Sequence, residues 1–320
     1  DAISKIDRLG GQGWGLSLSI ARRKPEPASK IVQRYLSAIK TDRSLGQNFL
    51  INEAPIQKSV EFSETLGLGN VSNVLEVGPG PGTLTSAILN TGADVTAIEI
   101  SSDACDFLAT ELTHPNLCLV NGDVLALQWP DNLTHVIANI PYGISSPILS
   151  KIQDYHQKSP LQGICLLVQR EFGNRMAMKT PPKDRGPLGI SLWLDFDCSI
   201  VMEVPRSCFR PQPEVDSSVI GLKPIFRDHI SDKERLSIKG LASWCFGRRR
   251  RKIRNSLRSA PNHVHRAWTV SRSDWIERLA TLEGKSRDFT ELGHKRPEEL
   301  DPESWVLLTR MIAHDDELPV

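Results

Sequence analysis

The chain has 320 residues, of which 39% are hydrophobic and 24% are charged, and its formal net charge is +1. This length and composition fit a globular protein with one large α/β domain and a second, smaller domain. No apolar run approaches the roughly 18 residues that a membrane-spanning helix needs, so we expect no membrane span.

Short apolar, β-rich segments alternate with helical segments up to about residue 225. Strands that alternate with helices indicate βαβ units and a mainly parallel sheet. The last two predicted strands have no long helix between them, which favours an antiparallel hairpin at the edge of the sheet. The seven predicted strands are 74–78, 95–100, 118–122, 135–139, 164–169, 199–204 and 217–223.

Helices are predicted between the early strands. Ser101, Ser102 and Asp103 are all suitable as the N-cap of the second of these helices, and Ser145 or Ser146 as the N-cap of the third. The predicted helices are 83–90, 102–112 and 146–156.

The pattern changes after about residue 225, where no strand-like alternation is found. Segments 231–247, 273–283 and 303–313 are typical of helices, and a PEEL sequence at 297–300 precedes the last of them. This predicts a small all-helical C-terminal domain with its boundary near residues 225–230. The division that we predict is 1–24, an extension without an assigned role, then 25–227 and 228–320.

Residues 248–258, RRRRKIRNSLR, carry seven positive charges in eleven residues and no acid. A solvated helix face is one explanation, but so dense a run repels itself. A polyanionic partner explains the run more simply.

The six cysteines form no CxxC pair, and most lie inside apolar runs. We expect reduced, buried thiols in a cytosolic protein, with neither a disulfide framework nor a zinc site. His263 and His265 form an HxH pair without a further ligand cluster, so no metal is expected there.

The first strand ends in VLEVGPGPGTLT, in which Gly78, Gly80 and Gly82 have the spacing GxGxG. Such glycines let the backbone turn sharply and bring a ligand close to the peptide plane. The spacing differs from the GxGxxG pattern that binds a pyrophosphate in dinucleotide enzymes. Glu76, just before the loop, would oppose a pyrophosphate, but it is compatible with a zwitterionic or cationic ligand such as S-adenosylmethionine.

Acidic residues end the next two strands. Glu99 is placed to accept hydrogen bonds from two ribose hydroxyls, and Asp123 can accept one from an adenine amino group. Each feature alone is compatible with ordinary turn chemistry. Together and in this order, GxGxG, Glu and Gly-Asp predict an S-adenosylmethionine-dependent methyltransferase.

The fourth strand ends in NIPY, residues 139–142, which resembles the motif of methyltransferases that modify exocyclic amino groups of bases. The Asn139 side-chain oxygen and a backbone carbonyl, that of Ile140, can accept the two N–H bonds of an adenine amine. Pro141 lacks an N–H and fixes its φ angle, which holds that carbonyl in place. Tyr142 offers a face on which a flipped base can stack. A strand-end turn with a packing tyrosine is the alternative explanation.

Further motifs indicate a family. RSLGQNFL (43–50), VPRSCFRPQPEVDSS (204–218), FGRRRRKIRNSL (246–257) and KRPEEL (295–300) accompany EVGPGPGTLT and NIPY. Over roughly residues 25–313 the chain resembles the KsgA-type small-subunit ribosomal RNA adenine dimethyltransferases. The resemblance implies a Rossmann-like α/β methyltransferase fold, with 25–227 as the cofactor-binding domain and 228–320 as a helical rRNA-binding domain.

The resemblance also implies roles for single residues in holding the cofactor. Asn48 and Leu50 would lie next to it, and Gly78 would contact its methionine part. Glu99 would bind the ribose and Asp123 the adenine. The cofactor-binding set that we predict is Gln47, Asn48, Leu50, Glu76, Gly78, Gly80, Glu99, Asp123 and Asn139.

On the side of the target base, the resemblance implies that Phe209 stacks opposite Tyr142, with Pro211 and Pro213 stiffening its loop. A core position for Phe209 is the alternative, but its neighbours favour a loop. The predicted catalytic set is Asn139, Ile140, Pro141, Tyr142 and Phe209. The predicted RNA-binding set is Arg248, Arg249, Arg250, Arg251, Lys252 and Arg254.

The function that the resemblance implies is S-adenosylmethionine-dependent dimethylation of two adjacent adenines near the 3′ end of small-subunit rRNA. The enzyme would act on a ribosome precursor particle, as a monomer in the cytoplasm. Two alternatives stay open. An isoleucine at the motif position of Ile140 is also found in the Erm methylases of large-subunit rRNA, so an Erm-like methylase is one alternative. The other is a non-catalytic assembly or transcription factor with the same fold.

Overall fold

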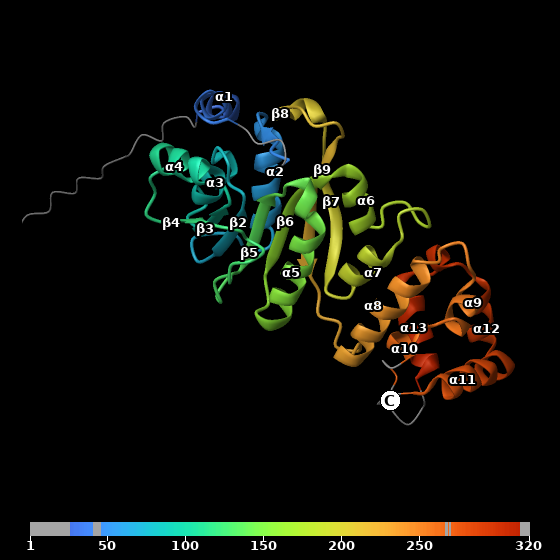
Figure 1. Cartoon of the computed structure of the whole chain (residues 1–320). Coiled ribbons are helices and arrows are strands. Elements are labelled where there is room, and N and C mark those ends of the chain that lie inside the picture. Colours follow the sequence, from blue (N-terminus) through green and yellow to red (C-terminus); the bar gives the residue numbers. More distant parts are fainter. Residues whose placement is uncertain (1–25, 41–45, 266–267, 269, 314–320) are drawn as a thin grey trace, which may run out of the picture.

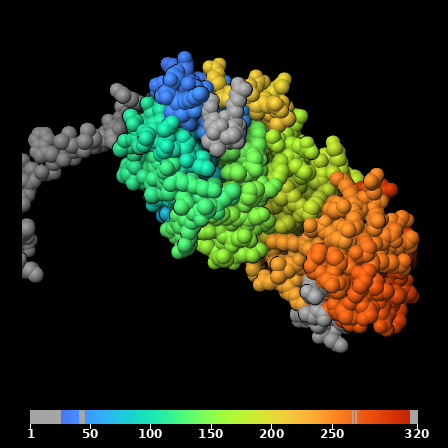
Figure 2. All heavy atoms as spheres, viewed as in Figure 1, coloured from blue at the N-terminus to red at the C-terminus, as the bar shows by residue number. Residues whose placement is uncertain are grey.

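The computed structural model describes residues 26–40, 46–265, 268 and 270–313. Figure 1 shows a sheet with helices on both faces and, beside it, a cluster of helices from the C-terminal region. In Figure 2 this cluster forms the orange and red lobe that lies against the larger one. The predicted extension, residues 1–24, and residues 43–45 of the RSLGQNFL motif lie outside the described residues.

The large part is built on a seven-stranded sheet of β2 (Asn73–Val77), β3 (Asp94–Glu99), β4 (Leu117–Asn121), β5 (His135–Asn139), β6 (Gly163–Gln169), β7 (Phe196–Val204) and β9 (Ser217–Pro224). The strand order is β4-β3-β2-β5-β6-β9-β7. Neighbours from β4 to β6 are parallel, whereas β9 is antiparallel to both β6 and β7. The seven predicted strands and the antiparallel hairpin at the sheet edge are therefore confirmed.

Helices cover both faces of the sheet: α1 (Ala28–Ala38), α2 (Glu53–Glu64), α3 (Thr83–Leu89), α4 (Ser102–Glu111), α5 (Ser145–Lys158), α6 (Arg170–Met176) and α7 (Pro187–Trp193). One apolar core lies between the sheet and α2 and α3, and a second lies between the sheet and α5, α6 and α7. A smaller one is formed by α1, β1 and α4. The three predicted helices are present as α3, α4 and α5. The others were not predicted, because α2 is mostly polar and α6 and α7 are short.

The helix caps confirm one prediction and correct another. The Ser101 hydroxyl accepts a hydrogen bond from the Ala104 N–H and caps α4. Neither Ser145 nor Ser146 caps α5, because its N-cap is Ile144, which ends a 3₁₀ turn (η2, Tyr142–Ile144) that leads directly into the helix.

A second, two-stranded sheet pairs β1 (Phe49–Leu50) with β8 (Phe209–Arg210) in antiparallel register. The Ile51 N–H also donates to the Cys208 carbonyl, at 2.8 Å. This small sheet joins the segment before α2 to the connection between β7 and β9. It was not predicted, because strands of two residues have no recognisable periodicity.

The helical part consists of α8 (Asp232–Phe246), α9 (Ile253–Arg258), α10 (Asn262–His265), α11 (Arg272–Lys285), α12 (Arg287–His294), the 3₁₀ turn η5 (Pro297–Glu299) and α13 (Pro302–Ile312). The predicted segments correspond to α8, α11, η5 and α13, whereas the short helices α9, α10 and α12 were not predicted. Its core contains Trp275 and Trp305, both fully buried. Ile190 and Leu194, from α7 and the residue after it, belong to the same core. A helix from the large part thus helps to anchor the helical part.

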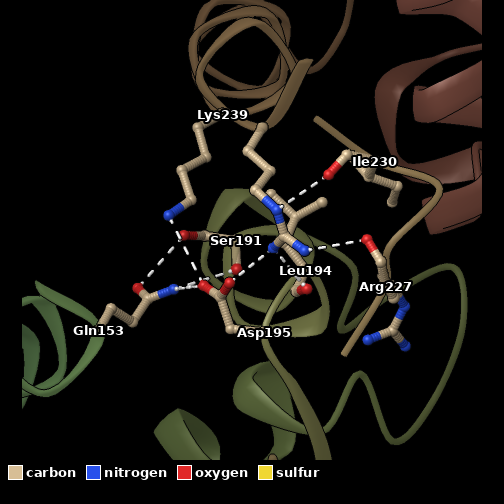
Figure 3. A network of polar contacts seen from close by, with 8 residues as sticks. Gln153, Ser191, Leu194, Asp195, Arg227, Ile230 and Lys239 are labelled. Atoms are coloured by element: carbon tan, nitrogen blue, oxygen red, sulfur yellow. Dashed lines mark hydrogen bonds and ion pairs between the residues drawn. The ribbon is translucent and has the colours of Figure 1, made fainter. Parts of the chain in front are cut away.

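A buried polar network links the two parts (Figure 3). Arg235 of α8 donates from Nη1 to the Asp195 carboxylate at 2.7 Å, and Asp195 precedes β7. Gln153 of α5 donates to the same carboxylate at 3.0 Å, and Lys239 lies 3.8 Å from it. The Arg235 guanidinium also donates to the backbone carbonyls of Leu194, Arg227 and Ile230. This network ties residues 225–231, which connect β9 to α8, to both parts.

The six cysteines are free thiols. Four are buried and Cys198 is partly buried, but Cys118, on the edge strand β4, is exposed, so the expected burial does not hold for it. No described helix is long and apolar enough to cross a membrane. Among the described residues, no three His, Cys, Asp or Glu side chains gather in a possible metal site.

Candidate functional site

A cavity of about 310 Å³ opens at the carboxyl ends of β2, β3, β4 and β5. This edge of a parallel sheet is where ligands bind in doubly wound folds. The cavity, called the cofactor cavity below, is lined by Gly46, Gln47, Asn48, Phe49, Val77, Gly78, Gly80, Ile98, Glu99, Ile100, Gly122, Asp123, Val124, Leu125, Asn139, Ile140, Pro141, Tyr142, Gly143 and Ile144.

The glycine loop after β2 needs glycine for both conformation and space. Gly80 has φ +52°, and a Cβ there would lie 2.8 Å from the Phe49 ring. Gly82 has φ +81°, and a Cβ there would lie 2.3 Å from the Leu108 side chain. Because L side chains rarely adopt this backbone region, larger residues would displace the loop from the cavity wall.

Glu99 ends β3, lines the cavity and is only 4% exposed. One carboxylate oxygen accepts from the Gly80 N–H at 3.2 Å, and the other from the Ser101 N–H at 3.0 Å. These bonds hold the carboxylate still, and each oxygen keeps a lone pair for a further donor. The arrangement suits two neighbouring hydroxyls.

Asp123 follows β4 and lines the cavity beside Gly122. Its Oδ1 accepts from the Leu125 N–H at 2.8 Å, which fixes the side chain over the turn. The other oxygen keeps its full capacity as an acceptor. Such an oxygen can accept a hydrogen bond from an amino group.

Asn139 ends β5, and its amide is oriented by the segment before β1. The Asn139 Nδ2 donates to the Asn48 carbonyl at 3.0 Å, and the Asn48 side chain donates to the Gly46 carbonyl at 3.0 Å. The amide nitrogen of Asn139 is therefore used within the protein, which leaves its Oδ1 to accept from a substrate.

The three residues after Asn139 are also held in place. The Ile140 N–H donates to the Leu167 carbonyl at 3.1 Å, and the Pro141 carbonyl accepts from the Ile144 N–H at 3.0 Å. The Tyr142 hydroxyl lies 2.7 Å from that of Ser217 on β9. Burial raises the pKa of Tyr142, so its ring is a neutral, fixed wall of the cavity.

Most of the predicted cofactor-binding and catalytic residues meet at this cavity, but three of them do not line it. Leu50, in β1, is buried in the core that the sheet forms with α2 and α3, and Glu76 is buried on the α3 side of the sheet, beside Thr85. Burial raises the pKa of Glu76 to about 8, so its carboxyl is protonated at neutral pH.

Phe209 is the third residue that does not line the cofactor cavity, and its predicted position on a loop is wrong. It lies in β8, opposite Leu50 of β1, with a side chain that is 3% exposed and packed in the core between the sheet and α2. The backbone pairing with β1, which sequence periodicity did not indicate, places it there. Its stacking on a base stays a prediction, which requires the side chain to leave this core.

Sequence reasoning missed the apolar lining residues Phe49, Ile100, Val124 and Leu125. Ile100 is 54% exposed, although it directly follows the buried β3. A large apolar residue immediately after a strand-end acid is a signal that could have indicated one wall of the cavity.

The first part of the arginine run lies in the turn between α8 and α9, and the rest forms α9. Residues 247–252 are called the basic turn below. Arg248 stacks on Trp244, with its Cζ 3.3 Å from the ring centroid. Arg249 donates to the Lys183 carbonyl at 3.0 Å and lies 3.6 Å from the Glu298 carboxylate. The remaining cations of the turn are exposed: Arg250, Arg251 and Lys252.

Arg254, the last residue of the predicted RNA-binding set, belongs to α9. Its side chain is partly buried, and its Nη1 lies 3.3 Å from the His294 ring. It therefore presents less charge to a partner than the exposed cations of the basic turn.

The cofactor cavity fits a nucleoside that carries a compact charged tail. Glu99 offers two fixed acceptors, Asp123 offers one, and Ile100 and Val124 offer apolar contact. The volume lies within the usual range of about 300–1,000 Å³ for small-molecule sites. With the parallel sheet, these features define an S-adenosylmethionine-dependent methyltransferase.

Comparison with known proteins gives the family. Residues 38–291 match the model of the family described as ribosomal RNA adenine dimethylase, and the chain belongs to this family. The predicted fold, enzyme class and cofactor are confirmed.

Similar proteins include "Ribosomal RNA small subunit methyltransferase A" of Alkaliphilus oremlandii, 34% identical over 73% of this chain and 82% of that protein. The protein of the same name from Bacillus cytotoxicus is 31% identical over 90% and 96%. Among solved structures, a dimethyladenosine transferase from Plasmodium falciparum has a TM-score of 0.67 and 25% identity, over 81% of this chain and 95% of that one. The 23S rRNA methyltransferase ErmE, with a TM-score of 0.59 and 24% identity, shares the fold.

Proposed function

We propose that this enzyme dimethylates the 6-amino groups of two adjacent adenines near the 3′ end of small-subunit rRNA. The observation that carries the proposal is the Asn139 amide, which lines the cofactor cavity and is oriented by the Asn48 carbonyl at 3.0 Å. Curated relatives that carry the name ribosomal RNA small subunit methyltransferase A support this substrate.

The chain's own residues would position the target adenine. Asn139 Oδ1 and the Ile140 carbonyl accept the two N–H bonds of the amine, which favours a nitrogen lone pair aimed into the cavity. The Tyr142 ring, fixed by Ser217, supplies a stacking face. Phe209 would complete the stack if RNA binding draws it out of the core.

The cofactor supplies an electrophilic methyl group on a sulfonium. We assign its ribose to Glu99, its adenine to Asp123 and its methionine part to the glycine loop with Gly78. Gln47, Asn48, Gly80 and Asn139 line the same cavity, while Leu50 and Glu76 support its walls from within the core.

The basic turn would bind rRNA phosphates. Phosphate contacts depend on charge more than on fixed geometry, and Arg250, Arg251 and Lys252 are exposed. Arg249 ties the turn to the loop before α7, so the charge is anchored to the methyltransferase part. We propose that the enzyme acts as a cytoplasmic monomer on a precursor of the small subunit.

The test is methyl transfer from labelled S-adenosylmethionine to unmethylated small ribosomal subunits and, in parallel, to protein-free large-subunit rRNA. Dimethyladenine on the small subunit alone is expected. Label on the large-subunit RNA alone would move the assignment to an Erm-like methylase. No label on either RNA, with cofactor binding intact, would favour a non-catalytic assembly factor.

A further inference from the structure

Lys151 of α5 makes three hydrogen bonds to one turn of backbone. Its ammonium donates to the carbonyls of Val124 at 2.8 Å, Leu125 at 2.9 Å and Leu127 at 2.6 Å. An ammonium has three N–H donors, so these bonds use all of them. Lys151 is therefore not free to bind a phosphate or to move a proton in the reaction.

The turn that Lys151 holds forms one wall of the cofactor cavity. The N–H groups of Ala126 and Leu127 both donate to the Asp123 carbonyl, so residues 123–127 form a single helical turn that is not continued. Asp123, Val124 and Leu125 line the cavity. The carbonyls at the end of such a turn lack partners unless a side chain supplies them.

Lys151 also joins this wall to the catalytic wall. Its helix, α5, begins at Ser145, directly after the 3₁₀ turn Tyr142–Ile144 that follows Pro141. The Lys151 ammonium lies 5.1 Å from the centroid of Trp129, whose Nε1 donates to the Val124 carbonyl at 3.0 Å. The adenine side and the target-base side of the cavity are thus joined through one side chain.

The charge on Lys151 matters for this contact. Three carbonyl oxygens that converge on one point repel each other, and a cation between them removes that repulsion. Partial burial lowers the pKa of Lys151, while the Asp123 carboxylate acts in the opposite direction. An uncharged side chain of the same length would leave the carbonyls of Leu125 and Leu127 without their donor.

We propose that Lys151 is a positioning residue for the cofactor's adenine: by binding three carbonyls of the 123–127 turn, it holds Asp123 at the distance from the catalytic wall that cofactor binding requires. The proposal rests on the assignment of Asp123 to the adenine. It predicts that Lys151 sets the affinity for S-adenosylmethionine and changes methyl transfer little once the cofactor is bound.

The test compares Lys151→Met, Lys151→Arg and the matched control Lys158→Met, which changes an exposed lysine at the end of the same helix. For Lys151→Met we expect the Kd for S-adenosylmethionine to rise about tenfold, with kcat at saturating cofactor within about threefold of wild type. Lys151→Arg should recover part of the affinity, because guanidinium keeps the charge but not the geometry. Lys158→Met should change neither quantity. An unchanged Kd in Lys151→Met, or a loss of kcat without a change in Kd, would overturn the proposal.

A double-mutant cycle with Asp123→Asn separates the two assignments. If Lys151 acts through Asp123, its replacement should raise Kd less in the Asp123→Asn background than in wild type. Equal increases in Kd in both backgrounds would show that Lys151 does not act through Asp123 and has only a general structural role. If Asp123→Asn alone leaves cofactor affinity unchanged, the assignment of Asp123 fails, whatever Lys151 does. Should Lys151→Met not fold, the cycle with Lys151→Arg gives the same comparison.

Discussion

In the cofactor cavity the functional side chains are held by backbone hydrogen bonds, whereas in the basic turn most of the cations face solvent. Glu99, Asp123 and Asn139 each make at least one such bond, at 2.8–3.2 Å. Arg250 and Arg251 are exposed, and only Arg249 is tied to a neighbouring backbone carbonyl.

This difference follows from what each region must recognise. Methyl transfer requires two atoms to be aligned, so small displacements of Asn139 or Tyr142 have a large cost. A phosphate backbone presents charge over a long distance and tolerates flexible partners. Preorganisation is therefore concentrated in the cavity, and the turn keeps cations available for RNA of varying shape.

The largest expected effect comes from Asn139→Ala. Loss of the amide oxygen removes one acceptor for the target amine, and methyl transfer should fall by roughly 1,000-fold. RNA binding should be retained, as measured by filter binding, because phosphate contacts lie elsewhere. Asn132→Ala, which changes an exposed residue in the turn before β5, is the control and should be near wild type. Equal loss of RNA binding and methyl transfer in Asn139→Ala would contradict the role of Asn139.

The next effect tests the polar network that joins the large part, which holds the cofactor cavity, to the helical part, which holds the basic turn. Arg235→Met leaves the Asp195 carboxylate, whose side chain is 7% exposed, without its 2.7 Å ion pair. We expect the free energy of unfolding, from urea denaturation, to fall by on the order of 3 kcal/mol. The affinity for S-adenosylmethionine should stay unchanged while methyl transfer to RNA falls. Lys158→Met, an exposed control at the end of α5, should leave both stability and methyl transfer unchanged. Similar losses of stability in the two variants would show that the network contributes little.

Removing charge from the basic turn should have a smaller, salt-dependent effect. In Arg250→Gln/Arg251→Gln, RNA affinity should fall about tenfold at low salt, and the slope of log affinity against log salt should shrink by about 2. The control, Lys158→Gln/Lys223→Gln, removes two exposed charges outside the basic turn, one at the end of α5 and one on β9. An unchanged slope in the arginine variant would argue against phosphate binding by the turn.

The effect that we expect to be smallest for methyl transfer concerns Glu76, whose titration changes stability with pH. Its folded pKa of about 8 lies above its ordinary value of 4.5, so the folded state holds a proton that the unfolded state releases. This contribution to stability is therefore present below about pH 4.5 and is lost as pH rises toward about 8. Glu76→Gln should remove the contribution of Glu76 to the fall in the free energy of unfolding between about pH 4.5 and pH 8. Urea denaturation across this pH range measures it. Parallel pH profiles for the two proteins would show that Glu76 does not titrate in this way.

Much of the large part could be predicted because each strand carries its own periodic signal. The seven strands, the three helices between the early ones and the strand-end acids all follow from local pattern. The short helices α9, α10 and α12 could not be predicted, because fewer than about three turns carry little periodicity. Phe209 was misplaced because β8 exists only through its pairing with β1, a contact between residues far apart in the chain.

The amino-acid sequence by itself determined the parallel sheet, the glycine loop, the acids at the ends of β3 and β4, the NIPY segment and the basic run. These are set by side-chain alternation, backbone preferences and charge, which act over a few residues. Only the tertiary structure decided that the Asn48 carbonyl orients Asn139, that Lys151 holds the turn after Asp123, and that Arg235 joins the two parts. Each of these contacts brings together chain segments 12 or more residues apart, and packing of the sheet and its helices determines which of them meet.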